Sequence, residues 1–396
     1  MILKKVTVMA FALMALGMEG QSRKTQMTKL IDENFKFADQ QFKVLMKGLP
    51  DDKVPQTYDA KTNKVVNYER TWWCTGFYPG SLLYVYEETK DPVMLKEAER
   101  VLKIIEPNQT YTGNHDLGFM MFCSFGNAYR ITKNPEYKKV IFNSAEALST
   151  RYRPSIHAIQ SWNKNARFDC PVIIDNMMNL EMLNWVSQNG GDKKYQDIAV
   201  THSNTTMKNH FRPDYSSYHV LDYDLNTGEV MKKKTWQGYS DESAWSRGQS
   251  WGLYGYTMMY RFTKDKRYLD FANKIANFIL TNPNLPKDKI PYWDFNAPDI
   301  PNAPRDASAA ALMASAFLEL GQYTTGKERK KYLDNAEQIL VNLSSPAYRA
   351  KLGENGGFLL MHSTGALPLK SEIDVPLVYA DYYFLEALKR YKDWYL

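Results

Sequence analysis

Apolar residues recur along most of the chain with the period of an α-helix, and little of it alternates as a β-strand would. The helical runs come in pairs, in which the first run is apolar all round and the second has one apolar face. The first runs, expected to be inner helices, are Gly76–Glu87, Asp116–Ile131, Asp175–Ser187, Trp245–Phe262, Asp306–Gly321 and Asp374–Arg390. The second runs, expected to be outer helices, are Ile31–Leu45, Val93–Ile105, Glu136–Arg151, Tyr195–His210, Lys266–Leu280 and Glu328–Leu343.

A recurring junction joins the two runs of a pair. Residues 86–92 read Tyr-Glu-Glu-Thr-Lys-Asp-Pro, and similar sequences return at 129–135 and 260–265. Such repetition indicates units that bury their apolar faces against neighbouring units. No flexible linker divides the chain, which indicates a single domain. The sequence therefore predicts an all-α fold, a single (α/α)6 barrel of six inner and six outer helices over residues 21–396. The long insertions, 211–244 and 281–305, are expected to be loops or a hairpin.

The first twenty residues have a different composition. Lys4 and Lys5 precede an apolar stretch from Val6 to Leu16, which is too short to span a membrane. A basic start, a short apolar core and small residues after it are typical of a secretory signal peptide. Residues 1–20 are therefore predicted to be removed on export, leaving a periplasmic protein without a membrane partner. The cleavage position is left open.

The bulk composition argues against several classes of function. Lys and Arg number 50 against 44 Asp and Glu, giving a net charge of +6, but they are scattered, which disfavours nucleic-acid binding. Three cysteines favour buried free thiols over a disulfide framework. The six histidines lack ligand spacing, so neither a metal site nor another cofactor is expected. The oligomeric state, monomer or weak dimer, is left open.

Two aspartates are the strongest candidates for chemistry. Asp116 and Asp175 each stand at the start of an apolar helical run, where a charge has no packing reason to be. An aspartate there can simply cap its helix. In the predicted barrel, however, all inner helices begin at one end, so these two carboxylates would face each other across one pocket. Paired carboxylates in a sugar-sized pocket suit acid/base chemistry at a glycosidic bond.

Other polar and aromatic residues gather at the same predicted rim. Aromatic faces stack on sugar rings, and Arg or His suits a carboxylate, so the rim predicts a pocket for an acidic sugar. Trp72 or Trp73 could instead plug the barrel. Arg247 could pair with Asp241 or Glu242 instead of binding substrate. The remaining rim acids Asp241, Asp306 and Asp374 are expected to be helix caps or arginine partners.

Seven segments in this chain resemble glycoside hydrolase family 88, the unsaturated glucuronyl hydrolases. The resemblance covers nearly the whole mature chain, and the segments come in the same order as in the family. They are Trp73–Phe77, His115–Phe119, Ile159–Trp162, Ile174–Leu180, Gln237–Ser243, Trp245–Gly252 and Tyr379–Tyr383.

This resemblance implies hydration of the C4=C5 double bond that polysaccharide lyases leave on a non-reducing uronic acid, without a cofactor. It makes Asp175 the general acid and base and Asp116 the second carboxylate. Ser363 and Lys370 match loosely a region that distinguishes sulfated from unsulfated glycosaminoglycan fragments, which suggests a preference for sulfated heparin- or chondroitin-type disaccharides. The positions that match substrate contacts of the family are Trp73, His115, Trp162, His219, Gln237, Arg247 and Trp251.

Three other functions stay open on the sequence. A related unsaturated rhamnogalacturonyl hydrolase, of the family 105 type, would share the fold and the paired aspartates. A conventional inverting glycosidase would need its carboxyl groups roughly 6.5–9.5 Å apart to admit water. A periplasmic protein that binds acidic oligosaccharides would leave the double bond intact.

Overall fold

The computed structural model describes residues 2–396, with side chains from Gln21 onward. The first helix, α1, is Ile2–Lys47. The predicted signal peptide, residues 1–20, lies outside the residues whose side chains are described and stays a prediction. Within the described part, no helix is both long and apolar enough to cross a membrane.

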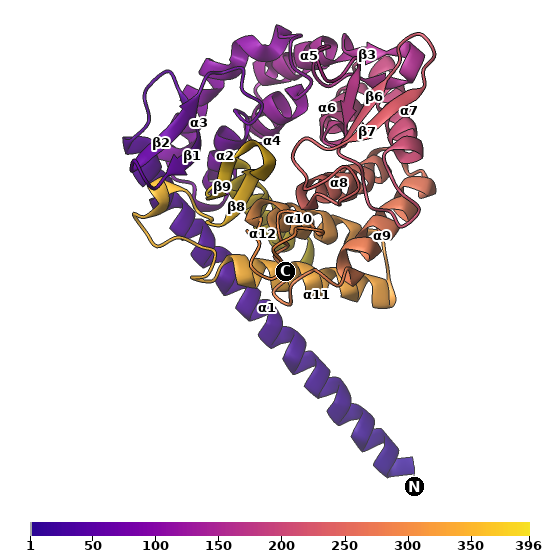
Figure 1. The fold of residues 1–396 in the computed structure, drawn as a ribbon. Helices are drawn as coiled ribbons and strands as arrows, with labels where there is room; N and C mark the ends of the chain where they lie inside the picture. The colour runs from indigo at the N-terminus through magenta and orange to yellow at the C-terminus, as the bar shows by residue number, and fades with distance from the viewer. Residues whose placement is uncertain (1) are drawn as a thin grey trace.

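Six helical segments contact one another in a closed ring (Figure 1). Each contacts the next in chain order, and the last returns to the first. Figure 1 shows these segments surrounding the middle of the molecule. They are α2 Phe77–Thr89, the π-helix η2 Gly118–Gly126 continued by α4 Asn127–Thr132, α6 Asn176–Gln188, α8 Ser246–Thr263, α10 Ala307–Gln322 and α12 Val378–Tyr395.

A second set of helices packs outside this ring. Each contacts the inner segment that precedes it in the chain, while α1 contacts both α2 and α12. The outer helices after α1 are α3 Pro92–Ile105, α5 Pro135–Ser149, α7 Lys194–Asn209, α9 Lys266–Thr281 and α11 Gly326–Leu343. The predicted mostly helical fold is confirmed. The apolar pattern identified the inner helices because they are covered on every side, as in α10, where residues 307–321 are all buried.

The predicted junctions have a common structure. In three of them a lysine, at position 90, 133 or 264, ends the inner helix with a left-handed backbone (φ 58–60°). The next residue, Asp or Asn, accepts a hydrogen bond from the backbone N–H two positions on and so caps the outer helix. The threonine before the lysine accepts the N–H of that capping residue. The Thr-Lys-Asp repeat therefore encodes a tight turn between antiparallel helices.

Short antiparallel strands, most of them not predicted, lie in the segments that connect the helices. They form three two-stranded sheets and one three-stranded sheet in the described part of the chain. Two- to six-residue strands are too short to give a clear alternating pattern. They are β1 Val54–Asp59, β2 Lys64–Tyr68, β3 Tyr152–Arg153, β4 Ala158–Ile159, β5 Pro171–Ile173, β6 Val220–Tyr223, β7 Val230–Lys234, β8 Ser363–Ala366 and β9 Ser371–Val375. The hairpin expected within 211–244 is confirmed as β6–β7.

Two helix predictions need correction. The second inner helix, predicted as one α-helix over 116–131, is a π-helix from Gly118 to Gly126 before it becomes α-helical. The sixth was predicted to begin at Asp374, but Asp374 lies in β9 and α12 begins at Val378. The pairing of β9 with β8 and the proline at position 376 both keep this segment extended.

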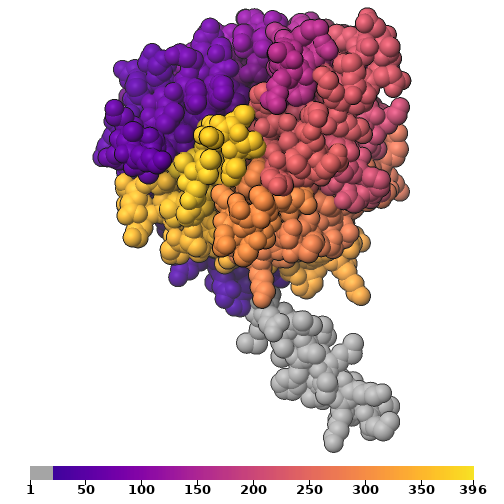
Figure 2. Space-filling model, in the orientation of Figure 1, coloured from indigo at the N-terminus to yellow at the C-terminus, as the bar shows by residue number. Residues whose placement is uncertain are grey.

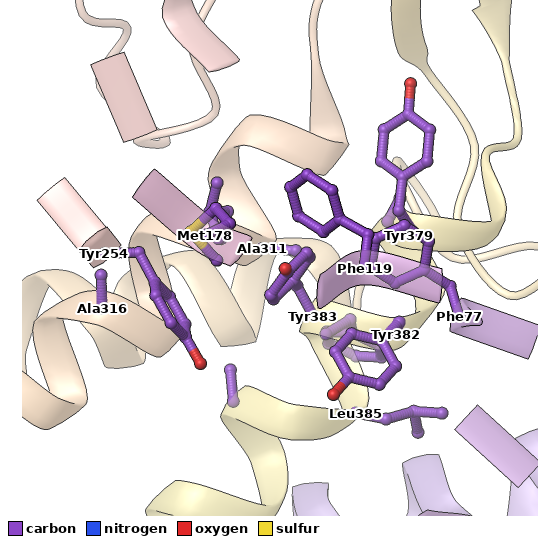
Figure 3. Packing of buried hydrophobic residues seen from close by; sticks show 14 of the residues in the cluster. Phe77, Phe119, Met178, Tyr254, Ala311, Ala316, Tyr379, Tyr382, Tyr383 and Leu385 are labelled. Atoms are coloured by element: carbon purple, nitrogen blue, oxygen red, sulfur yellow. The ribbon is translucent and has the colours of Figure 1, made fainter. Parts of the chain in front are cut away.

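An aromatic layer fills the ring below the starts of the inner helices (Figure 3). Phe119 of η2 lies 5.5 Å from Phe77 of α2 and 5.1 Å from Trp251 of α8, measured between ring centroids. Trp251 in turn lies 5.5 Å from Tyr383 of α12. Such tilted and edge-on ring pairs stabilise a core by more than the burial of their apolar surface alone. The layer gives the candidate site a rigid, apolar floor.

Candidate active site

Asp116 and Asp175 both lie at helix starts, but neither carboxylate caps its helix. Their residues are only 8% and 9% exposed. Asp306, in contrast, accepts the N–H of Ser308 at 3.0 Å and pairs with Arg247 at 2.7 Å. The alternative that Asp116 and Asp175 are ordinary caps is therefore wrong, which leaves two buried carboxyl groups free for chemistry.

The other two rim aspartates have structural partners. Asp241 pairs with Lys234 at 2.7 Å and accepts the N–H of Thr235. Asp374 pairs with His362 at 2.6 Å. Neither is a cap of an inner helix, and both have their charge satisfied by a neighbour. The prediction that these two residues are helix caps or arginine partners is therefore wrong, because their partners are a lysine and a histidine.

A histidine flanks each candidate carboxyl group. The His115 Nε2 atom lies 3.3 Å from Asp116 Oδ1, and His219 Nε2 lies 3.7 Å from Asp175 Oδ2. His219 Nδ1 accepts the backbone N–H groups of Trp236 and Gln237, so the proton of the neutral ring is on Nε2. That N–H points to the side of the ring on which Asp175 lies.

Burial changes the pKa of all four groups. It raises the pKa of Asp175 to about 7, although the charge of Arg247 and the indole N–H of Trp251 oppose the rise. Burial, and then the negative charge of Asp175, raises the pKa of Asp116 to about 8. Burial lowers the pKa of both histidines to about 3, so the rings are neutral near pH 7. A proton is therefore available on the carboxyl groups near neutral pH.

Buried polar atoms without a hydrogen-bond partner within the described chain gather around these carboxyl groups. Buried polar groups are nearly always paired, so such a cluster marks a place where a polar ligand would supply the bonds. The atoms in or next to the site are both ring nitrogens of His115, Asp175 Oδ2, Asn179 Nδ2, His219 Nε2, Trp251 Nε1 and Ser363 Oγ.

Arg247 is held in place by the chain itself. Its guanidinium donates to Asp306, to the carbonyl of Thr364 at 2.7 Å and to that of Gly365 at 2.5 Å. Gln237 also donates to the Gly365 carbonyl, at 3.1 Å. The pairing of Arg247 with Asp241 or Glu242 is therefore wrong: its partner is Asp306, because the fold brings the starts of α8 and α10 together. Arg247 and Gln237 both hold β8 beside the site through the Gly365 carbonyl, and their contact with substrate stays a prediction.

The predicted tryptophans lie at different depths. Trp251 is 1% exposed and belongs to the aromatic layer. Trp73 is partly buried, 5.0 Å from Tyr379, and Trp162 is partly buried with its ring 6.4 Å from that of His115. Trp72 stacks on Tyr68 at 4.6 Å and is 39% exposed, so it does not plug the ring.

Ser363 and Lys370 are not brought together. Ser363 is fully buried in β8, whereas Lys370 is exposed at the turn that leads into β9. Figure 2 shows this hairpin, in yellow, between the indigo and violet N-terminal part and the red β6–β7 region. A sulfate-binding role for either residue stays a prediction.

The sequence analysis missed Asn179. It lies one helical turn after Asp175, is fully buried, and accepts the backbone N–H groups of Gly118 and Phe119 at 2.8 and 3.3 Å. The available signal was the spacing of Asp175 and Asn179, which places both side chains on one face of α6. Among residues 21–396, no cluster of three or more His, Cys, Asp or Glu side chains could hold a metal ion.

Comparison with known proteins agrees with this geometry. Residues 45–394 match Glycosyl Hydrolase Family 88. An unsaturated glucuronyl hydrolase of Formosa agariphila is 49% identical over 320 residues, which cover 80% of this chain and 79% of that protein. An unsaturated chondroitin disaccharide hydrolase of Streptococcus pyogenes is 32% identical over 346 residues, covering 85% of each.

Solved structures show the same likeness. The crystal structure of an unsaturated glucuronyl hydrolase specific for heparin has a TM-score of 0.89 and 46% identity, with 92% of this chain and 97% of that chain covered. The unsaturated glucuronyl hydrolase of Streptococcus agalactiae has a TM-score of 0.85 and 30% identity, covering 93% of each. A mutant of that enzyme was solved with the disaccharide dGlcA-GalNAc6S.

The chain belongs to glycosyl hydrolase family 88. It is a hydrolase, and the expected class of activity, that of an unsaturated glucuronyl hydrolase on glycosaminoglycan oligosaccharides, is confirmed. These relatives favour neither the rhamnogalacturonyl hydrolase nor the binding protein without catalysis.

Proposed function

We propose that this enzyme hydrates the C4=C5 double bond of the non-reducing unsaturated uronate, with Asp175 as general acid and base. The observation that carries this proposal is a pair of buried carboxyl groups that do not cap their helices. Their raised pKa values keep a proton available near neutral pH. An ordinary aspartate would have lost its proton well below that pH.

The proposed reaction uses one water molecule. Asp175 donates its proton to C4 as the π bond opens, which leaves positive charge shared between C5 and the ring oxygen. Water adds to C5 and gives a proton back to the Asp175 carboxylate, so the acid is regenerated. The hemiketal at C5 then opens to a ketone, and the hemiacetal formed at C1 releases the rest of the saccharide.

The neighbours of Asp175 fit these steps. The neutral His219 ring presents its N–H on the side of the carboxyl group, and Arg247 lies close enough to lower the pKa of Asp175. This positive field would stabilise the carboxylate left after proton transfer. We assign Asp116, held at 3.3 Å from His115, to binding of the sugar hydroxyl groups.

The proposed substrate is an unsaturated disaccharide of a sulfated glycosaminoglycan. The relatives include enzymes named for heparin and for chondroitin disaccharides, and the heparin-specific structure shares 46% identity. We assign Ser363 and Lys370 to sulfate recognition. Tighter competition by an unsulfated disaccharide than by its sulfated counterpart would contradict this assignment.

We also propose that the helices form an (α/α)6 barrel and that the enzyme is periplasmic. The closed ring of inner segments, each covered by an outer helix, supports the barrel. A crystal structure in which α12 did not meet α2 would contradict it. Lys4 and Lys5 before a short apolar stretch support export.

The first experiment follows the ultraviolet absorbance of the unsaturated uronate on heparin- and chondroitin-type disaccharides. The wild type should remove the signal, and Asp175→Asn should lower the rate by about 10²–10⁴-fold because it cannot donate a proton. Asp265→Asn is the matched control, since Asn also caps a helix and Asp265 lies at the exposed start of α9. Persistence of the signal on every uronate, pectic ones included, would rule out the hydration reaction.

A further inference from the structure

The two helices that carry the candidate carboxyl groups meet at one buried side chain. Asn179 of α6 accepts the N–H groups of Gly118 and Phe119, in the first turn of η2. The first N–H groups of a helix have no partner inside that helix, and Leu117, which precedes η2, supplies no side-chain cap. Asn179 therefore caps η2 from the neighbouring helix.

The contact leaves no room for a larger residue at position 118. A Cβ atom on Gly118 would lie 2.5 Å from the Asn179 Cα and 2.6 Å from its Oδ1. The backbone of η2 thus approaches α6 as closely as the chain allows. Because Asp116 lies two residues before Gly118, and Asp175 lies one turn before Asn179, this contact also fixes the two aspartates relative to each other.

The same bonds determine where the amide nitrogen of Asn179 points. With Oδ1 taken up by two N–H groups, Nδ2 lies in the amide plane on the opposite side of the Cβ–Cγ bond. Nδ2 is buried without a hydrogen-bond partner in the described chain. The Asn179 side chain also opposes the rise in the pKa of Asp116. The Asn179 amide is therefore near enough to Asp116 to act on its carboxyl group.

We propose that Asn179 is a positioning residue for the hydration reaction, which docks η2 on α6 and so holds Asp116 in place relative to Asp175. The inference rests on the proposed function, because it assigns a role to a residue that positions the carboxyl pair instead of contacting the reacting carbons. The groups that share the surroundings of Asp116 are His115, Asp175, Arg151 and the Cys74 thiol.

Two substitutions separate the two contributions of Asn179. Asn179→Asp keeps an oxygen that can cap η2 but replaces the donor with an acceptor. Asn179→Ala removes both. We expect both variants to lose about 10–100-fold in kcat, as small displacements of catalytic groups do, with a smaller change in KM. We also expect the pKa of Asp116 to rise in both variants, because Asp116 loses a donor that favours its charged form.

Asn184 supplies the matched control. It lies on the same helix, is also fully buried, and donates to the Leu180 carbonyl at 2.9 Å within its own helix. Asn184→Ala should lower the melting temperature without changing the pKa of Asp116. If the Asn179 variants behave like Asn184→Ala, with kcat and the Asp116 pKa unchanged, Asn179 has only a structural role and the inference is wrong.

A measurement without turnover guards against misfolding and against failure of the proposed function. NMR titration of the Asp carboxyl carbons should show a higher pKa for Asp116 in folded Asn179→Asp than in the wild type. An unchanged Asp116 pKa would overturn the inference even if activity fell. If the wild type itself did not hydrate the substrate, the proposed function would fail, while the titration would still decide the role of Asn179.

Discussion

At the scale of single residues, two aspartates at similar helix starts acquire different properties from their surroundings. Burial acts on both, but the like charge acts mainly on Asp116, whose pKa rises to about 8, while Arg247 restrains that of Asp175 at about 7. Because the groups interact, they titrate as a pair. At Asp175 burial is the largest cause of the raised pKa.

The pH dependence of activity follows from these values. A general acid must be protonated, and the protonated fraction of Asp175 falls as the pH rises through about 7. We therefore expect kcat/KM on the unsaturated disaccharide to decline above about pH 7, approaching a tenfold loss per pH unit. Initial rates from pH 4 to 9 measure this limb. A decline that already begins near pH 4 would mean that the acid has an ordinary carboxyl pKa.

At the scale of helices and strands, the pattern of apolar residues predicted where an element lies better than whether it is an α-helix, a π-helix or a strand. The Thr-Lys-Asp junctions could be predicted because their chemistry is local, whereas the first turn of η2 is capped by Asn179 of α6, far away in the sequence. The strand β9 was missed because its pairing with β8 outweighs the helical pattern of the following segment. At the opposite ends of the inner helices, Glu319 of α10 joins Arg261 of α8 to Arg390 of α12.

This ion cluster gives a test of how the inner helices are held together. Glu319 is 2% exposed in its side chain, and burial would raise its pKa, but the charges of Arg261 and Arg390 lower it to about 2. Glu319→Gln should cost about 3–5 kcal/mol in the free energy of unfolding, because it removes the buried charge that Arg261 and Arg390 share and leaves them only their other acids, Glu181 and Glu386.

Glu181→Gln is the comparison for this cluster, since Glu181 pairs with the same Arg261 but keeps 19% of its side chain exposed. It should cost less, about 1 kcal/mol or below. Urea unfolding followed by circular dichroism measures both values. Equal costs would show that burial does not set the strength of this cluster.

At the scale of the whole molecule, the site exists only because the chain closes on itself. It draws Trp73 from before α2, His219 from beside β6 and Ser363 from β8, segments that are far apart in the sequence. The contact of α12 with α2 closes the ring, and α1 packs against both of these helices. Burial of the carboxyl groups, and hence their pKa values, depends on that closure.

Export is a second property of the whole chain that can be tested. Expressed in a Gram-negative host, the protein should be recovered from the periplasm with its first residues removed, close to position 20. Replacing Leu13 by Arg should keep the chain in the cytoplasm, because it interrupts the apolar core of the signal. Fractionation followed by mass spectrometry of the N-terminus measures both. An intact N-terminus in the cytoplasm of wild-type cells would contradict the prediction.

The sequence alone determined the helix pairs, their junctions and the two carboxyl groups, because period, capping residues and isolated charges are local signals. Tertiary structure decided which acids have a charged partner. It paired Asp306 with Arg247 and Asp374 with His362, whereas Asp116 and Asp175 lie beside histidines that burial keeps neutral. It also made Asn179 part of the site. Burial and contacts between distant segments control these properties, and neither can be read from neighbouring residues in the chain.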